Sequence, residues 1–188
     1  KVRAGQIKPT WRCYEIWCLI ALMDVFARQG SFSPASRQDL WIHRLRNHGR
    51  DGGLTLDLPN DRPLVLTRKK DVFTDRIEIR YEPQVPGRRG ADGMPVKEGF
   101  RQLSPDFLIR VERLDSGYLN AGISDKQSYD IILDAKYRDY NACPKMAADD
   151  GWVVAKAKYL EGLRGASHFP NGIAPHAVFI LHSTPPQG

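Results

Sequence analysis

The run Tyr129–Lys136, with the sequence Tyr-Asp-Ile-Ile-Leu-Asp-Ala-Lys, limits the fold more than any other segment of the chain. Its aliphatic and β-branched centre is typical of a buried β-strand, so the fold must contain a β-sheet. Because side chains alternate between the two faces of a strand, Asp134 and Lys136 share one face, while Leu133 and Ala135 point to the other. The sequence therefore predicts a carboxylate and an amine on one face at the end of a strand.

Hydrophobic periodicity predicts the other elements of this sheet and the helices beside it. The helices are expected over Pro9–Gln29, Ser33–Asn47 and Trp152–Arg164, and the other strands over Leu54–Leu58, Leu64–Thr67, Arg76–Tyr81, Pro105–Glu112 and Ala177–Leu181. Loops are expected over 83–99, 114–126 and 141–151. Short connections favour an antiparallel meander, and the last helix allows a crossover to a parallel final strand. We expect an α/β fold with a mixed β-sheet flanked by helices and a helix-strand-strand-strand-helix-strand core.

The length of 188 residues suits one domain, which we expect to span residues 1–188. The helix and short strands around residues 33–70 are expected to form an insertion in it. The chain begins at Lys1 rather than Met and ends in Pro-Pro-Gln-Gly, so we expect a domain excised from a larger protein. The longest apolar run, Ile16–Met23, is too short to span a bilayer, so no membrane partner is expected.

Charge and cysteine content narrow the class of function. The net charge of +6, from 28 Lys and Arg against 22 Asp and Glu, favours a polyanionic partner such as nucleic acid. The cysteines, Cys13, Cys18 and Cys143, form no Cys-x-x-Cys pair, which argues against a zinc site and fits a reducing, cytoplasmic setting. The sequence contains no histidine metal motif, no Walker loop and no dinucleotide-binding glycine fingerprint.

Two further carboxylates are candidates to join Asp134 and Lys136. Asp106 begins a predicted strand, and if the two strands are neighbours it converges with Asp134 and Lys136 at one edge of the sheet. Glu15 lies within the apolar stripe of the first helix, where an unpaired carboxylate is costly. Neighbouring carboxylates repel unless a cation lies between them, and a cluster of oxygen ligands suits Mg²⁺ or Mn²⁺ rather than zinc.

These motifs carry a family resemblance. Ser104-Pro105-Asp106 is followed by Asp134-Ala135-Lys136, and the helix that bears Tyr14-Glu15-Ile16-Trp17 lies upstream of both. The set resembles the PD-(D/E)xK nuclease superfamily, and the run Ile-Leu-Asp-Ala-Lys-Tyr is most similar to the McrC-type nuclease subunits of restriction systems. The resemblance implies a restriction-endonuclease-like fold and a Mg²⁺-dependent (or Mn²⁺-dependent) DNA endonuclease.

The resemblance also implies a role for each motif residue. Asp106 and Asp134 would ligate Mg²⁺ together with the backbone carbonyl of Ala135. Lys136 would position or activate the attacking water, and Glu15 would orient water or ligate a second metal ion. Many relatives carry Gln-x-x-x-Tyr on the following helix, whereas the nearest equivalent here is Lys156 or Lys158 with Tyr159.

Basic residues outside the motifs are candidates for contacts with DNA phosphates. The expected nucleic-acid-binding residues are Lys156, Lys158, Arg138, Lys69 and Lys70. Tyr14 and Trp17, in contrast, are expected to belong to the hydrophobic core.

The resemblance places such a domain in a restriction or anti-phage defence system, as the cutting module of a larger machine with a motor or recognition subunit or domain. Two other interpretations stay open from the sequence. In the first, the chain is a non-catalytic nucleic-acid-binding or assembly module that keeps the nuclease fold. In the second, it is a nuclease that cuts RNA.

Overall fold

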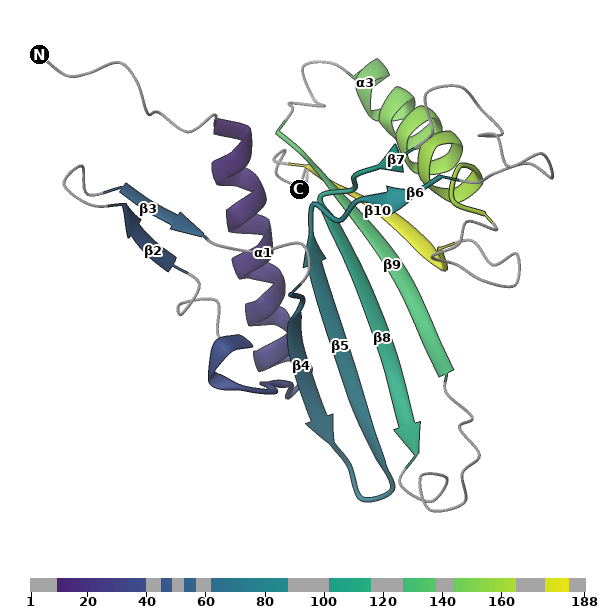
Figure 1. Cartoon of the computed structure of the whole chain (residues 1–188). Helices are drawn as coiled ribbons and strands as arrows, with labels where there is room; N and C mark the ends of the chain where they lie inside the picture. Colours follow the sequence, from purple (N-terminus) through teal and green to yellow (C-terminus); the bar gives the residue numbers. More distant parts are fainter. Residues whose placement is uncertain are drawn as a thin grey trace, which may run out of the picture.

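A six-stranded mixed sheet organises the computed structural model, which describes residues 10–39, 45–48, 53–56, 62–87, 102–115, 127–137, 144–164 and 175–182. Within these ranges the strand order is β1-β4-β5-β8-β9-β10 (Figure 1). The strands are β1 (Ser33–Pro34), β4 (Leu64–Lys69), β5 (Phe73–Tyr81), β8 (Phe107–Asp115), β9 (Gln127–Lys136) and β10 (Ala177–His182). Neighbouring strands from β1 to β9 are antiparallel, and β10 is parallel to β9. The predicted meander and the parallel final strand are confirmed.

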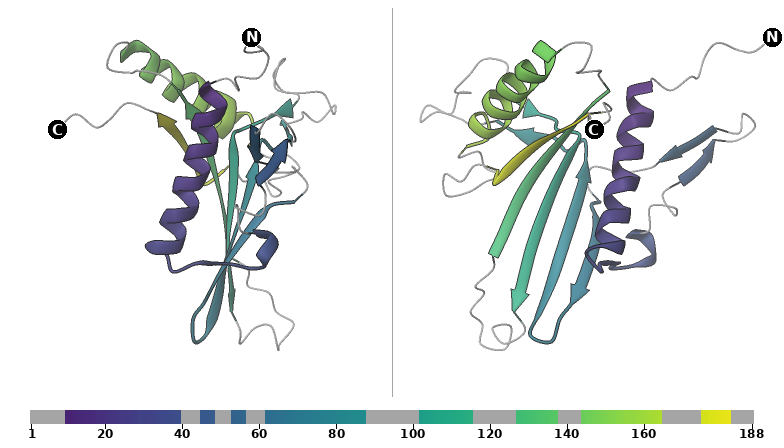
Figure 2. Two further views of the ribbon diagram at one scale, coloured as in Figure 1. Left: turned by 90° about the vertical axis from the view of Figure 1, so that its left-hand side faces the viewer. Right: turned by 180° about the vertical axis from the view of Figure 1, so that it is seen from behind.

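The long helix α1 (Thr10–Arg28) covers one face of this sheet (Figures 1 and 2). Its inward residues include Leu19 and Met23, which pack into a core with side chains from β4, β5, β8 and β9. The sheet contributes alternate residues of each strand to this core, as the period of two requires. Its members from the sheet are Leu64, Leu66, Ile77, Ile79, Tyr81, Phe107, Ile109, Leu133 and Ala135. The predicted helix over Pro9–Gln29 is confirmed within the described residues.

A second, smaller core lies on the other face of the sheet. Helix α3 (Pro144–Asp149) continues into η4 (Asp150–Glu161), whose turns are of the wider π type. Tyr159 and Leu163 are fully buried there against Leu108 of β8 and Ile132 of β9. Because Ile132 and Leu133 are consecutive residues of one strand, the two cores meet across β9. The helix begins earlier than the predicted Trp152, inside the segment expected to be a loop, and Pro144 suits its first turn.

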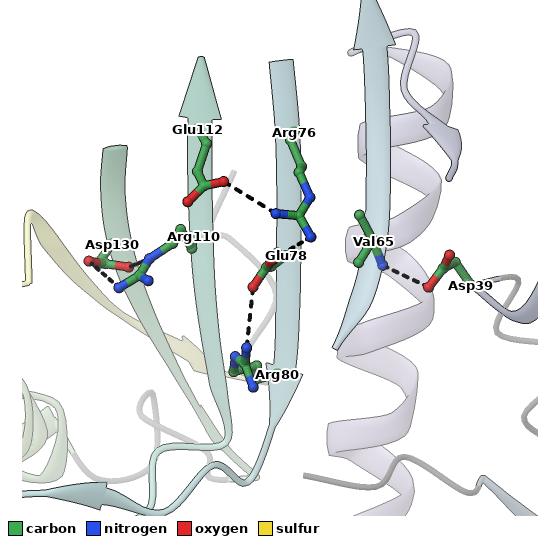
Figure 3. Close-up of polar contacts among 8 residues, drawn as sticks. All are labelled: Asp39, Val65, Arg76, Glu78, Arg80, Arg110, Glu112 and Asp130. Atoms are coloured by element: carbon green, nitrogen blue, oxygen red, sulfur yellow. Dashed lines mark hydrogen bonds and ion pairs between the residues drawn. The ribbon is translucent and has the colours of Figure 1, made fainter. Parts of the chain in front are cut away.

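The helix expected over Ser33–Asn47 is wrong. Ser33–Pro34 instead pairs with Thr67 and Leu66 as strand β1, and a 3-10 turn, η1 (Arg37–Asp39), follows it. Asp39 accepts a hydrogen bond from the backbone N–H of Val65 at 3.1 Å (Figure 3). This segment therefore provides a partner for a backbone donor on the outer edge of β4. Backbone pairing with a distant strand has overridden local helix propensity.

The remaining strands form two small separate sheets. β2 (Leu45–His48) pairs with β3 (Gly53–Leu56), outside the main sheet (Figure 2). β6 (Val85–Pro86) pairs with β7 (Gln102–Leu103). β4 lies within the segment expected as an insertion, but it belongs to the main sheet. No helix in the described part of the chain is long and apolar enough to cross a membrane.

Beyond the second core, the face of the sheet that η4 covers carries a ladder of ion pairs (Figure 3). Its members are Arg76, Glu78 and Arg80 on β5, Arg110 and Glu112 on β8, and Asp130 on β9. Arg110 Nε, for example, lies 2.8 Å from Asp130 Oδ1. The arginines are partly exposed and each lies beside a more deeply buried carboxylate, so this surface carries little uncompensated positive charge.

We expect the α1 core to hold the sheet together. Phe107 is fully buried and its ring centroid lies 5.6 Å from that of Tyr81. Phe107→Ala should lower the free energy of unfolding by about 3–5 kcal/mol, because it removes a buried ring and leaves a cavity. Phe179→Ala, at a side chain that is 52% exposed on β10, should cost less than about 1 kcal/mol. Urea denaturation of both variants checks this, and equal losses would contradict it.

Candidate active site

The pairing of β8 with β9 brings two carboxylates together. Phe107 is the register partner of Leu133, so the residue before Phe107, Asp106, lies beside Asp134 at the end of the two strands. The backbone N–H of Ala135 donates a hydrogen bond to Asp106 Oδ2 at 2.5 Å. Asp106 and Asp134 are 28 positions apart in the sequence, but the pairing of β8 with β9 brings them together in space.

Lys136 lies against Asp134 on the η4 side of the sheet. Asp134 is 2% exposed, and the Nζ atom of Lys136 forms an ion pair with its Oδ2 atom. Lys136 itself is partly buried, so its ammonium group is held at the site rather than extended into bulk solvent. The two side chains share a face, as the alternation of the strand requires.

Tyr159 of η4 completes the surroundings of Asp134, and the sequence analysis did not include it among the site residues. Its hydroxyl group donates a hydrogen bond to Asp134 Oδ1 at 3.0 Å. Burial, followed by the negative charge of Asp134, raises the pKa of Tyr159, so the phenol keeps its proton and acts as a donor. The available signal was a tyrosine on the helix after the Asp-Ala-Lys strand, but periodicity alone does not show which side chains of that helix reach the sheet.

Glu15 approaches from the α1 layer. It is buried, and Tyr81 Oη donates a hydrogen bond to Glu15 Oε2 at 2.7 Å. Its charge acts on Asp106, whose pKa it helps to raise. The structure thus joins Asp106, Asp134 and Lys136 directly, whereas Glu15 is linked to them through this electrostatic effect. Tyr81, which holds Glu15, was not identified as a site residue from the sequence.

Asp106 has a strongly perturbed carboxyl group. Burial raises the pKa of Asp106 to about 7, and the negative charge of Asp134 adds to this effect. The hydrogen bond from Ala135 and the ammonium of Lys136 act in the opposite direction without cancelling it. Below about pH 7 the positive charge beside Asp106 is therefore too small to keep its carboxyl group ionised, which is the electrostatic condition that a divalent cation relieves.

The carboxylate oxygens of Asp106 and Asp134 are the candidate ligands for a metal ion at this site. Asp134 Oδ2 is buried and accepts no regular hydrogen bond from the described residues, although it contacts Lys136. In the described part of the chain, no group of three or more His, Cys, Asp or Glu side chains surrounds a common metal position. Mg²⁺ is usually bound through one or two carboxylates and keeps several waters. Asp106 and Asp134 fit that requirement.

The basic residues expected to bind nucleic acid lie in different places. Lys156 and Lys158 are on η4, the helix that touches Asp134, and Lys158 Nζ lies 4.6 Å from the centre of the Tyr159 ring. Lys69 ends β4 and Lys70 follows it, at the opposite end of the sheet from Asp134. Arg138 lies outside the described residues.

The expectation that Trp17 belongs to the core is wrong, since its side chain is 62% exposed. At about 100° per residue, Trp17 points roughly 200° away from Glu15, so the burial of Glu15 turns Trp17 outward. Tyr14 is partly buried and packs against the edge of the α1 core, so the expectation holds in part for this residue.

Comparison with known protein families gives a match over most of the chain. The family model of the PD-(D/E)XK nuclease superfamily matches residues 12–151, which is most of the chain and includes Glu15, Asp106, Asp134 and Lys136. The same comparison with curated proteins and with solved structures gives no significant match.

The raised pKa of Asp106 predicts a specific dependence of stability on pH in the metal-free protein. Between about pH 4 and pH 7, folded Asp106 keeps a proton that the unfolded chain loses. Its contribution to the free energy of unfolding should therefore fall as the pH rises through this window. Asp106→Asn should remove that fall, whereas Asp24→Asn, at an exposed site on α1, should keep it.

Denaturant titrations at several pH values in the presence of a chelator measure this difference. If Asp106→Asn and the unsubstituted protein show the same change of stability with pH, the assignment of the raised pKa to Asp106 is wrong.

Proposed function

The chain belongs to the PD-(D/E)XK nuclease superfamily, and from that premise we propose that it is a Mg²⁺-dependent DNA endonuclease. One observation carries the proposal. Asp106, Asp134 and Lys136 meet at the end of two adjacent strands, and all three lie within the matched residues. A carboxylate pair with an adjacent ammonium is suited to phosphodiester hydrolysis, in which negative charge develops around phosphorus.

In this proposal Asp106, Asp134 and the backbone carbonyl of Ala135 hold Mg²⁺ or Mn²⁺. Glu15 would orient a water molecule or ligate a second metal ion. When bound, the cation neutralises the charge of the scissile phosphate and stabilises the pentavalent transition state. Buried Asp134 is suited to this role because its position is fixed from two sides, by Lys136 at Oδ2 and by Tyr159 at Oδ1.

Lys136 positions the water that attacks phosphorus, because its ammonium group is held beside Asp134 rather than in bulk solvent. The water oxygen forms a bond to phosphorus, and the bond from phosphorus to the 3′-oxygen breaks. The attacking water gives a proton to solvent and the departing 3′-oxygen takes one from solvent, so the products are a 5′-phosphate and a 3′-hydroxyl. The ammonium group also offsets negative charge as this transfer proceeds.

Lys156 and Lys158 are proposed to contact the DNA backbone near the cut, since η4 carries both of them and also Tyr159. Lys69, Lys70 and Arg138 remain candidates for contacts with DNA further from the cut. The ion-pair ladder is less suited to that role because its arginines already lie beside carboxylates.

The setting proposed is a restriction or anti-phage defence system of the McrC type. Its support is the resemblance of Ile132–Arg138 and Tyr14–Trp17 to that family's motifs. The chain would act in the cytoplasm as the cutting module, with a motor or recognition subunit or domain that supplies specificity. The free thiols of Cys13 and Cys18 are compatible with a reducing compartment.

The proposed activity predicts the result of a nuclease assay. With Mg²⁺ or Mn²⁺, the protein should nick plasmid DNA, and Lys136→Ala and Asp134→Ala should each lower the rate at least about 100-fold. Lys145→Ala, at an exposed position on α3, should keep the rate of the unsubstituted protein. Matched RNA substrates distinguish a DNA nuclease from an RNA nuclease.

Equal nicking by all these variants would point to a contaminating nuclease. If none of them nicks but all bind DNA with a salt dependence that Mg²⁺ does not change, the chain is a non-catalytic binding module.

The hydrogen bond from Tyr159 to Asp134 predicts an effect on the metal requirement. Tyr159→Phe keeps the buried ring but removes the donor to Asp134 Oδ1, so the Mg²⁺ concentration for half-maximal nicking should rise about 10- to 100-fold. Tyr129→Phe, at an exposed position near the other end of β9, should leave it unchanged. Mg²⁺ titrations of the nicking rate measure both, and an unchanged midpoint for Tyr159→Phe would show that the hydrogen bond does not position Asp134.

A further inference from the structure

Three aromatic side chains form a cluster at the end of the sheet that carries the candidate site. We call Tyr14, Trp17 and Tyr137 the aromatic platform. The rings of Tyr14 and Trp17 are stacked, with centroids 5.9 Å apart and planes 17° from parallel. The ring of Tyr137 lies 5.7 Å from that of Tyr14 at a tilt of 53°. The cluster joins the start of α1 to the end of β9, which lie at the same end of the molecule (Figure 1).

The platform lies at the strand end that carries the proposed catalytic residues, with Tyr137 turned toward α1 and Lys136 toward η4. Tyr137 follows Lys136 in the chain, so their Cα atoms are about 3.8 Å apart. Glu15 lies between Tyr14 and Trp17 on α1. A nucleic-acid strand that passes the end of β9 with a phosphate at Lys136 would therefore run toward the platform around the end of the strand.

The platform is exposed to an extent that a structural role does not explain. Trp17 is 62% exposed and Tyr137 is 55% exposed, although large aromatic side chains normally gain stability from burial. Tyr14 is partly buried at the edge of the α1 core and holds the other two rings in place. Exposed aromatic surface that is fixed in one arrangement beside a candidate site is typical of a ligand-binding surface.

We propose that the aromatic platform stacks against an unpaired base of the nucleic-acid strand that is cut. This inference rests on the proposed nuclease function and names its substrate class. A base inside a duplex has both faces covered by its neighbours, so an aromatic side chain reaches a free face only in a single strand, a frayed end or a flipped nucleotide. The net charge of +6 favours the phosphates of the same nucleic-acid strand.

Stacking on an aromatic ring tolerates any base, because every base has a π-face. The platform therefore confers a preference for nucleic-acid structure rather than for sequence. The substrate expected is DNA with unpaired nucleotides next to the cleaved phosphate.

The test measures binding without cleavage. Fluorescein-labelled 20-nucleotide single strands and a blunt duplex of the same sequence are titrated with the full chain in a chelator at fixed salt, and the dissociation constants are read from anisotropy. Trp17→Ala and Tyr137→Ala should each weaken single-strand binding by about 5- to 100-fold and duplex binding by less than about twofold. Trp17→Phe, which keeps an aromatic face, should retain most of the single-strand affinity.

Another exposed tyrosine of strand β9 provides a matched control. Tyr129 is 48% exposed near the other end of β9, eight residues and therefore about 26 Å from Tyr137. Tyr129→Ala should change neither dissociation constant. Thermal melting of each variant verifies that it is folded.

The outcomes separate this proposal from the nuclease proposal. Equal losses of affinity for single strand and duplex, or no loss of affinity in Trp17→Ala and Tyr137→Ala, would overturn the platform proposal even if plasmid is nicked. A selective loss on single strands would support the platform even if plasmid is not nicked. A concentration-dependent dimer in light scattering that Trp17→Ala abolishes would show that a second copy of the chain covers the platform, and would also overturn the proposal.

Discussion

The pairing of β8 with β9 is the constraint on which the rest of the candidate site depends. It sets Phe107 opposite Leu133, and that register fixes Asp106 beside Asp134 and lets Ala135 donate its backbone N–H to Asp106. A slip of one residue would turn every side chain of β9 to the other face, so that Asp134 would enter the α1 core. The cost of burying that carboxylate among the apolar side chains of the α1 core, in the place of Leu133 and Ala135, opposes the slip.

The two cores also create the electrostatic character of the site. Each helical layer helps to bury a carboxylate of the site, and a tyrosine donates a hydrogen bond to that carboxylate, from β5 on one face and from η4 on the other. Tyr81 donates to Glu15 in the α1 layer, and Tyr159 donates to Asp134 in the η4 layer. Asp106, between these layers, keeps a raised pKa because burial and the neighbouring carboxylates outweigh Lys136. The fold therefore gathers negative charge at one end of the sheet and balances it incompletely, which is the condition that favours a divalent cation.

Sequence reasoning worked where a single element carries the information, and it failed where two elements meet. The alternation of β9 predicted the shared face of Asp134 and Lys136, and periodicity predicted α1. The prediction of a helix over Ser33–Asn47 was wrong because Ser33 and Pro34 pair with the backbone of β4, which lies about 30 positions further along the chain. Tyr81 was missed because its partner lies 66 positions away and no local pattern marks it. Tyr159 was noted only as the nearest equivalent of a motif tyrosine, because its contact with Asp134, 25 positions away, depends on how η4 packs on the sheet.

The sequence by itself determined the strand Tyr129–Lys136, the buried helical Glu15 and the motif residues that identify the superfamily, because periodicity and short motifs are local properties. Tertiary structure alone decided that Asp106 lies beside Asp134, that Tyr159 holds Asp134, and that Trp17 is exposed beside Tyr14. The physical reason is that register, burial and ring contacts arise from packing between elements that are distant in the chain. Their energies depend on neighbours that the linear order does not specify.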